Sequence, residues 1–375
     1  MRNFYRLAAL TLSTALAAPH LDATAQGFSS EHGRINVVTV ARGLEHPWGL
    51  AFLPDGRLLV TERAGRMRVV AREGTLSAPL SGLPPVAAQG QGGLLDVALD
   101  RQFTANRTIY FSFAEPGDGG AGTSVARARL GAAGLDDVRV IFRQMPKVRG
   151  GLHFGSRIVQ APDGNLFVAL GERYQRDRAQ DLGTHLGKVV RIRPEGGAAP
   201  GNPFAGRAGA QPEIWSYGHR NAQGAALDPA TGLLWIVEHG AQGGDEINRP
   251  QAGRNYGWPV ITYGRDYSGA SIGEGTAKSG MEQPLYYWDP SIAPSGMAFY
   301  DADAIPGWKG SILIGALKYR LLVRLSRDGE KVLREERLLD GLNERIRDVR
   351  VGPDGFVYLL TDNADGRVLR VEPAR

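Results

Sequence analysis

The chain has 375 residues and no cysteine, which excludes disulfide bonds, thiol nucleophiles and thiolate metal sites. The H-E-x-x-H motif of zinc proteases is also missing. The glycine-rich stretch at 90–93 is not a dinucleotide-binding fingerprint, because no alternation of strands and helices surrounds it. Lysine and arginine number 44 against 39 acidic residues, and they are scattered along the chain. Such scattering is typical of a solvated surface, so we expect no nucleic-acid partner.

Long apolar stretches are missing after residue 25, so we expect no membrane span. Near the start, Arg2 and Arg6 accompany residues 7–18, which are all apolar or hydroxyl-bearing. These residues are too few for a membrane helix, which needs about 20. Ala23-Thr24-Ala25 then matches the A-x-A pattern of a cleavage site. We therefore predict a signal peptide over 1–25, export to the periplasm, and one catalytic domain over 26–375.

Glycine is abundant, with 51 residues, which indicates many tight turns. A Pro-Asp-Gly turn recurs at 54–56, 162–164 and 353–355, and a longer variant lies at 228–232. In such a turn proline presets φ and glycine adopts the left-handed conformation. The five or six residues after each turn are mostly β-branched, aromatic or leucine, as in strands buried on both faces.

Segments 107–113 and 310–315 are similar strands without that turn, which gives six units in all. Their period of roughly 45–80 residues fits propeller blades lengthened by loops. The sequence therefore predicts an all-β fold, a six-bladed β-propeller of four-stranded antiparallel blades, with seven blades as the alternative. Polar residues stand where several of these strands end, namely Glu62, Glu172, Glu238 and Asp362. Equivalent strand ends share one rim, so these residues either line a site or solvate loops.

Three segments combine polar residues with glycine. His153 lies between glycines, and it is either a structural histidine or a general base at neutral pH. Arg220 and Asn221 supply donors that suit an oxygen-rich planar ligand. Asp245 and Glu246 follow a glycine-rich stretch and offer oxygen ligands for Ca²⁺, although their spacing is not that of an EF-hand.

Read together, these and further segments resemble the glucose/sorbosone dehydrogenase family, and within it the soluble aldose sugar dehydrogenases that use pyrroloquinoline quinone (PQQ). The matching stretches run in order along nearly all of the predicted mature chain. They are HPWGL at 46–50, QGGLL at 91–95, HFG at 153–155, AQDL at 179–182, GKVVRI at 187–192, NPF at 202–204, EIW at 213–215, YGHRNAQG at 217–224, DEIN at 245–248, NYGWP at 255–259, GALK at 315–318 and RIRD at 345–348.

The resemblance implies a role for each matching residue. His153 would be the general base that takes the proton of the anomeric hydroxyl, and Arg220 would polarise the quinone oxygen. The positions that would hold PQQ are Gln91, Asn221, Lys318, Arg345 and Arg347. Carbonyl groups of Gly240 and Ala241 would bind the Ca²⁺ of the cofactor, and Glu246 with the Tyr256 backbone would bind a second Ca²⁺. Leu152 stands where the glucose enzymes carry an acidic neighbour of the base, so the partner that orients His153 is not assigned.

The function implied is oxidation of aldose sugars to aldonolactones, with electrons passed to an external acceptor, by a monomer or a homodimer. Two alternatives stay open: a calcium-dependent propeller lactonase, and a non-catalytic propeller that binds glycans or proteins. The cations Lys318, Arg345 and Arg347 favour the dehydrogenase, because a lactonase needs no cluster that matches a tricarboxylate. Lys188 and Arg191 are expected on the surface.

Overall fold

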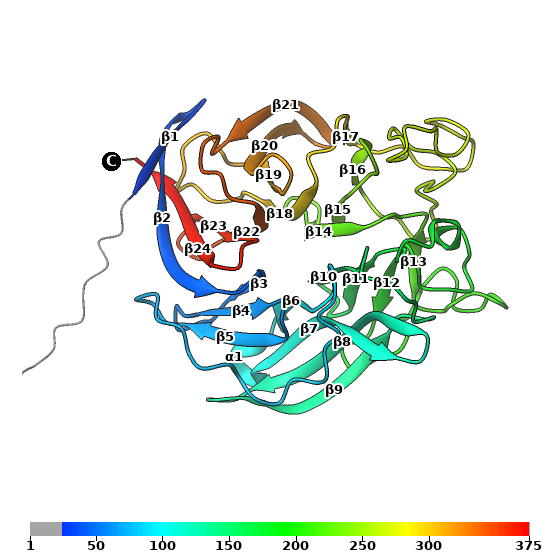
Figure 1. The fold of residues 1–375 in the computed structure, drawn as a ribbon, viewed down its shortest axis with the longest axis horizontal. Coiled ribbons are helices and arrows are strands. Elements are labelled where there is room, and N and C mark those ends of the chain that lie inside the picture. Colours follow the sequence, from blue (N-terminus) through cyan, green and yellow to red (C-terminus); the bar gives the residue numbers. More distant parts are fainter. Residues whose placement is uncertain (1–24, 375) are drawn as a thin grey trace, which may run out of the picture.

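The computed structural model describes residues 25–374, which form six antiparallel sheets around a central axis (Figure 1). The predicted signal peptide lies outside the described residues, apart from Ala25. In the described chain the helical segments are α1 (Phe103–Asn106) and the 3₁₀ turn η1 (Arg176–Ala179), and no helix there is long and apolar enough to cross a membrane. The predicted all-β, six-bladed propeller is confirmed.

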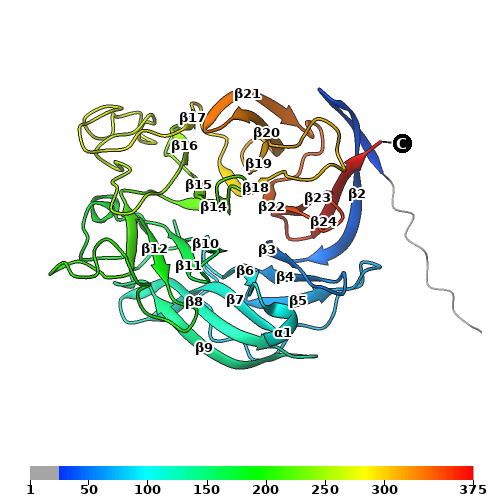
Figure 2. The same cartoon turned by 180° about the vertical axis from the view of Figure 1, so that it is seen from behind.

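Each sheet is one blade, and in the first five blades the strands follow the chain from the centre of the ring outwards (Figure 2). The first blade has three strands, β3 (Pro47–Phe52), β4 (Leu58–Glu62) and β5 (Arg66–Val70). The next four blades have the expected four strands. They are β6 (Leu94–Leu99), β7 (Thr108–Gly117), β8 (Gly120–Leu130) and β9 (Leu135–Arg143); β10 (Gly155–Gln160), β11 (Leu166–Leu170), β12 (Lys188–Ile192) and β13 (Ile214–Tyr217); β14 (Ala222–Leu227), β15 (Leu234–Glu238), β16 (Asp245–Asn248) and β17 (Tyr286–Trp288); and β18 (Pro294–Phe299), β19 (Ile312–Ala316), β20 (Leu321–Asp328) and β21 (Lys331–Leu338).

The sixth blade joins the two ends of the described chain. Its C-terminal strands are β22 (Ile346–Val351), β23 (Val357–Thr361) and β24 (Gly366–Pro373), and its N-terminal strands are β2 (Gly33–Leu44) and β1 (Gln26–Ser30). β2 runs antiparallel to β24, with Thr39 opposite Leu369, and the two strands lie side by side in Figure 1. The ring is therefore closed by strand pairing, which leaves no open sheet edge between the first and last blades.

The Pro-Asp-Gly turns join the inner strand of a blade to its second strand, at the ends of β3, β10 and β22. All inner strands therefore begin on the opposite face of the ring. Near that face the pairing of inner and second strands is interrupted in all six described blades, for instance between Ala222 and Gly224. Such bulges re-aim side chains and are common beside functional sites, so this face is the expected location of a site.

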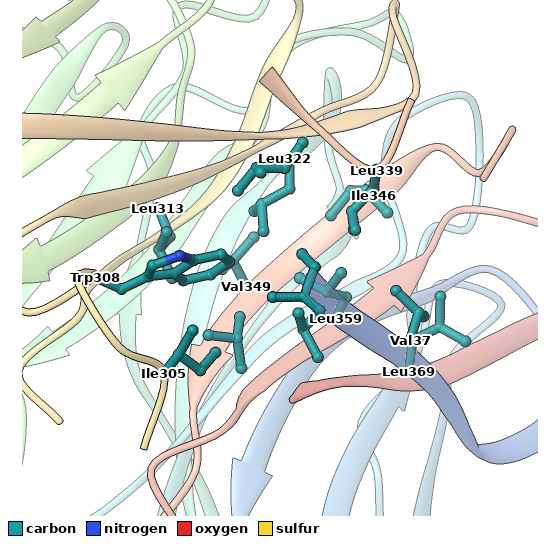
Figure 3. Packing of buried hydrophobic residues seen from close by; sticks show 14 of the residues in the cluster. Val37, Ile305, Trp308, Leu313, Leu322, Leu339, Ile346, Val349, Leu359 and Leu369 are labelled. Carbon is teal, nitrogen blue, oxygen red and sulfur yellow. The ribbon is translucent and has the colours of Figure 1, made fainter. Parts of the chain in front are cut away.

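Apolar side chains fill the spaces between neighbouring blades. Figure 3 shows one such cluster, where Trp308 and Leu313 of the fifth blade pack with Leu359 and Leu369 of the sixth. Repeated packing of this kind holds the blades at fixed angles, and thereby fixes the distances between residues at the starts of the inner strands.

Charged side chains of the inner strands meet near the axis of the ring. Arg157 Nη1 of β10 lies 2.8 Å from Asp96 Oδ1 of β6 and 3.1 Å from Asp348 Oδ1 of β22. Arg350 contacts the same two aspartates, at 2.8 Å and 2.9 Å. Two cations thus balance two anions, as burial requires, and the network ties together three blades that are not all neighbours along the chain.

Lys188, expected on the surface, is fully buried, so that prediction was wrong. Burial lowers the pKa of Lys188, and the charge of Asp181 acts in the opposite direction. The sequence does not reveal that backbone carbonyl groups surround the ammonium group of Lys188.

Candidate active site

Several of the predicted site residues lie at the starts of inner strands, on one face of the ring. His153 and Gln91 shortly precede β10 and β6, and Arg220 and Asn221 directly precede β14. Arg347 is the second residue of β22. Because all inner strands begin on the same face, residues more than 200 positions apart in the sequence meet at one mouth of the channel.

His153 is buried and forms a hydrogen bond with a carboxylate. Its Nδ1 atom lies 2.8 Å from Glu172 Oε1, at the end of the neighbouring strand β11. Because a carboxylate only accepts hydrogen bonds, this contact favours the tautomer with hydrogen on Nδ1, which leaves Nε2 free to accept a proton. Burial lowers the pKa of His153, and the charge of Arg220 adds to this, while Glu172 acts in the opposite direction. The net lowering favours the neutral imidazole, which is the form that a general base needs.

The backbone of His153 is held from three sides. Its φ is 53°, in the left-handed region that costs energy for a residue with a side chain. The side-chain oxygen of Gln91 accepts a hydrogen bond of 2.8 Å from His153 N. Any Cβ on Gly171 would lie 2.0 Å from the carbonyl oxygen of His153, so glycine is required there. Asn221 Oδ1 accepts from Gly155 N at 3.0 Å. Gln91 and Asn221 thus fix the base through their oxygens.

Arg220 lies opposite His153, across the boundary between the third and fourth blades. Its Nη1 donates to the carbonyl oxygen of His239 at 3.2 Å, and its guanidinium lies 5.2 Å from the ring centroid of Trp258. Three buried nitrogens have no partner among the described residues, namely Arg220 Nε, His239 Nε2 and Trp258 Nε1. Burial and the charges of Arg220 and Arg347 hold the pKa of His239 well below its ordinary value. Two orphan donors and a neutral imidazole suit a ligand rich in oxygen.

Further cations lie on the blades that complete the ring. Arg347 donates to Gln223 Oε1 at 2.6 Å and to Asp362 at 2.9 Å. Burial raises the pKa of Asp362, but Arg347 and His46 outweigh it and hold that pKa well below its usual range. Arg345 donates to the carbonyl oxygen of Leu317, directly before Lys318. Lys318 forms no ion pair with any described residue, so its charge is available to an anionic ligand.

The residues predicted to bind metal lie beside Arg220. A small cavity is lined by Gly240, Glu246 and Tyr256 together with Arg220 and Trp258. Ala241 lines the adjoining cavity. Residues 25–374 contain no group of three or more His, Asp or Glu side chains that could hold a metal ion. A metal ion here would therefore depend mainly on backbone carbonyl oxygens, which Gly240, Ala241 and Tyr256 supply in the predicted ligand set.

Glu246 is the one carboxylate of that predicted set. Asn248 Nδ2 donates to Glu246 Oε2 and to Glu238 Oε1, both at 3.0 Å, and Asn248 Oδ1 has no partner among the described residues. Burial and the charge of Glu238 raise the pKa of Glu246 to about 8. Two buried carboxylates this close, with an unpaired amide oxygen, are the environment that a Ca²⁺ ion stabilises. The phenol of Tyr256 is occupied by Arg249 O and Gln251 N, which leaves only its backbone as a possible ligand.

The side of the mouth near His153 is lined by two loops with exposed tyrosines. The Tyr174 ring lies edge-on to the His153 ring, with centroids 5.5 Å apart. Tyr174 and Tyr267 both line the small cavity that Glu172 and Arg220 also line. An ion pair of 2.9 Å between Arg176 and Asp266 joins the two loops. The cavity lined by Glu172, the partner of the base, thus has a partly aromatic wall.

Known proteins share both the sequence and the architecture. A family model described as glucose/sorbosone dehydrogenase matches residues 44–370. The chain belongs to this family. An aldose sugar dehydrogenase of Escherichia coli is 48% identical, with 99% of each chain covered. The crystal structure of an E. coli soluble aldose sugar dehydrogenase in its apo form has a TM-score of 0.89, at 49% identity, covering 91% of this chain and 100% of that one. A PQQ-bound aldose sugar dehydrogenase of Streptomyces coelicolor has a TM-score of 0.76, at 31% identity, covering 90% and 98%.

Sequence reasoning missed two residues of this site. Glu172 was noted only as a strand-end carboxylate, although the end of β11 is the expected neighbour of the start of β10. His239 follows the strand-end Glu238 and carries no local signal of its own. A Gly-x-Ser-x-Gly pattern also occurs, at 269–273, but it lies in a loop between β16 and β17 without the strand and helix of a nucleophile elbow.

Proposed function

We propose that this chain is a periplasmic dehydrogenase that oxidises aldose sugars at the anomeric carbon, with PQQ and Ca²⁺ as cofactors. The observation that carries the proposal is the buried pair His153–Glu172, because Glu172 lines the same small cavity as Arg220, beside nitrogens that have no partner among the described residues. PQQ, when bound, supplies the acceptor for the hydride of the anomeric carbon. The product is then the aldonolactone, and the electrons pass to an external acceptor.

Some residues of the chain would transfer the proton, and others would stabilise negative charge. His153 Nε2 takes the proton of the anomeric hydroxyl, and Glu172 stabilises the imidazolium that forms. Arg220 stabilises negative charge that develops on an oxygen beside it. Lys318 would hold a carboxylate of PQQ, and Arg345 and Arg347, which both form ion pairs with Asp362, would add further positive charge.

Calcium fits the neighbouring cavities. Carbonyl groups of Gly240 and Ala241 would bind the Ca²⁺ that accompanies PQQ, where it would act as a Lewis acid. A second Ca²⁺ would be held by Glu246 and the backbone of Tyr256. The proximity of Glu246 to Glu238 supports this second site, because a cation relieves their repulsion.

The test is dye-linked glucose oxidation by the purified apoprotein, before and after addition of PQQ with Ca²⁺. We expect activity only after reconstitution, with an aldonolactone as the first product. His153→Ala should lower kcat by about 10²–10⁴-fold. The matched control is His185→Ala, which removes another buried histidine paired with a carboxylate, Glu213. Failure to bind PQQ by absorbance titration would refute the dehydrogenase, and lactone hydrolysis by the apoprotein with Ca²⁺ would establish the lactonase instead.

A further inference from the structure

The ammonium group of Lys188 occupies a closed cage of backbone oxygens. Lys188 is the first residue of β12, and none of its surface is exposed. Its Nζ atom donates to the carbonyl oxygens of Leu186 at 2.7 Å and of Arg178 and Ala179 at 3.0 Å each. Three acceptors match the three hydrogens of an ammonium group. The cage thus joins two parts of the segment between β11 and β12, at 178–179 and at 186, to the start of β12.

A short chain of hydrogen bonds leads from this cage to the partner of the base. Arg178, whose carbonyl binds Lys188, donates from its backbone N to Gln175 O at 2.9 Å. Gln175 N in turn donates to Glu172 O at 2.8 Å. Glu172 is the residue that holds His153. The position of the carboxylate thus depends on a turn that Lys188 fixes.

The same segment also contacts the fourth blade, which carries Arg220. Ala179 O, bound by Lys188, accepts a second hydrogen bond from Gly218 N at 3.0 Å. Nearby, Glu172 N donates to Arg220 O at 2.9 Å. Arg220 and His153 come from different blades, so their separation depends on contacts of this kind across the blade boundary.

We propose that Lys188 is a positioning residue for the oxidation reaction: by holding the turn at 175–179, it keeps Glu172 in contact with His153 and fixes the distance between His153 and Arg220. The inference rests on the proposed function, because it assigns Lys188 to the reaction of that site. An ammonium is suited to this cage because it is compact and presents three donors, whereas the planar guanidinium of arginine is larger and cannot converge on three oxygens. A methionine would leave three buried carbonyl oxygens unpaired.

The experiment compares Lys188→Met, Lys188→Arg and a control in the PQQ-reconstituted enzyme. The control, Arg324→Met, removes another buried cation, which binds Glu336 and Ser311 in the fifth blade. We expect both Lys188 variants to lower kcat by about tenfold or more at nearly constant KM, since small displacements of reacting groups are costly. They should also shift the acid limb of the pH profile. Arg324→Met should lower the melting temperature and leave kcat and the pH profile unchanged.

A second measurement needs no bound cofactor. The pKa and tautomer of His153 are read from nitrogen-15 NMR spectra of the apoprotein, with Lys188→Gln as a milder variant in case Lys188→Met does not fold. The charged or titratable groups that act on His153 are Glu172, Arg220, Arg173 and His239. We expect Lys188→Gln to change the His153 pKa and Arg324→Met to leave it unchanged. The inference would be overturned if the folded Lys188 variants had an unchanged His153 pKa and a kcat within twofold of the wild-type value. Absence of sugar oxidation by the wild type would refute the proposed function, and the NMR comparison would still decide whether Lys188 positions Glu172.

Discussion

His153 and Glu172 meet at 2.8 Å because one precedes the inner strand of the third blade and the other follows its second strand. Antiparallel pairing of β10 with β11 brings Gly155 opposite Leu170, so the residues beyond each end must lie side by side. The third blade therefore supplies both the base and the group that orients it.

Replacing Glu172 by Gln should lower kcat with little change in KM, because the amide no longer fixes the tautomer that leaves Nε2 free. A comparable loss of an orienting carboxylate costs about 10⁴-fold in serine proteases, and we expect a decrease of at least about 10²-fold. The pH profile provides a second readout. Glu172 raises the pKa of His153, so the acid limb of kcat/KM should move to lower pH in the variant. An acid limb that stays in place or moves upward would contradict this assignment.

Arg220 should not tolerate replacement by lysine. Its guanidinium lies against Trp258 and binds His239 O while Nε stays unpaired, and a lysine ammonium cannot reproduce this planar arrangement. We expect Arg220→Lys to lower kcat by about 10²–10³-fold, the usual effect of losing one donor to developing charge. The measurement is steady-state kinetics with glucose, alongside thermal melting to confirm folding. Equal kcat values for the variant and the wild type would exclude this role for Arg220.

Binding of Ca²⁺ at Glu246 should stabilise the folded protein. Because Glu246 and Glu238 are buried close together, Ca²⁺ should raise the melting temperature of the wild-type apoprotein. Glu246→Gln should lose most of this increase. The control is Glu274→Gln, which alters a glutamate whose side chain is 65% exposed and paired with Lys278. The same increase in Glu246→Gln as in the wild type would place the ion elsewhere.

The strand pattern and turns were sufficient to predict the six blades, because each Pro-Asp-Gly turn and the strand after it are local features. The site was predictable only where residues matched family motifs, as for His153 and Arg220. To predict the role of Glu172 one must know which strand ends are neighbours. To predict the burial of Lys188 one must know the path of the loop before β12. Three carbonyl oxygens that converge on an ammonium leave no trace in the sequence, because every residue carries a carbonyl.

The channel network gives a prediction about stability. Arg157→Met would leave Asp96 and Asp348 with Arg350 as their remaining cation, so two buried anions would share one partner. Breaking a buried ion pair in this way costs about 3–5 kcal/mol. Arg129→Met, in which a 55%-exposed arginine is lost, should cost less than about 1 kcal/mol. Urea unfolding of both variants tests this, and equal midpoints would show that the network adds no stability.

Ring closure should depend on β2 and not on β1. Deleting residues 26–31 removes the outermost strand of the sixth blade, whereas deleting 26–44 also removes β2 and exposes the edge of β24. An unpaired edge is a template for association between chains, and the first and sixth blades lose the strand that connects them. We therefore expect the shorter deletion to stay monodisperse, or to keep the wild-type oligomeric state, with a modest decrease in melting temperature. The longer deletion should aggregate or unfold without a cooperative transition, as judged by light scattering and circular dichroism. A cooperative wild-type-like transition after loss of β2 would mean that packing between blades closes the ring without strand pairing.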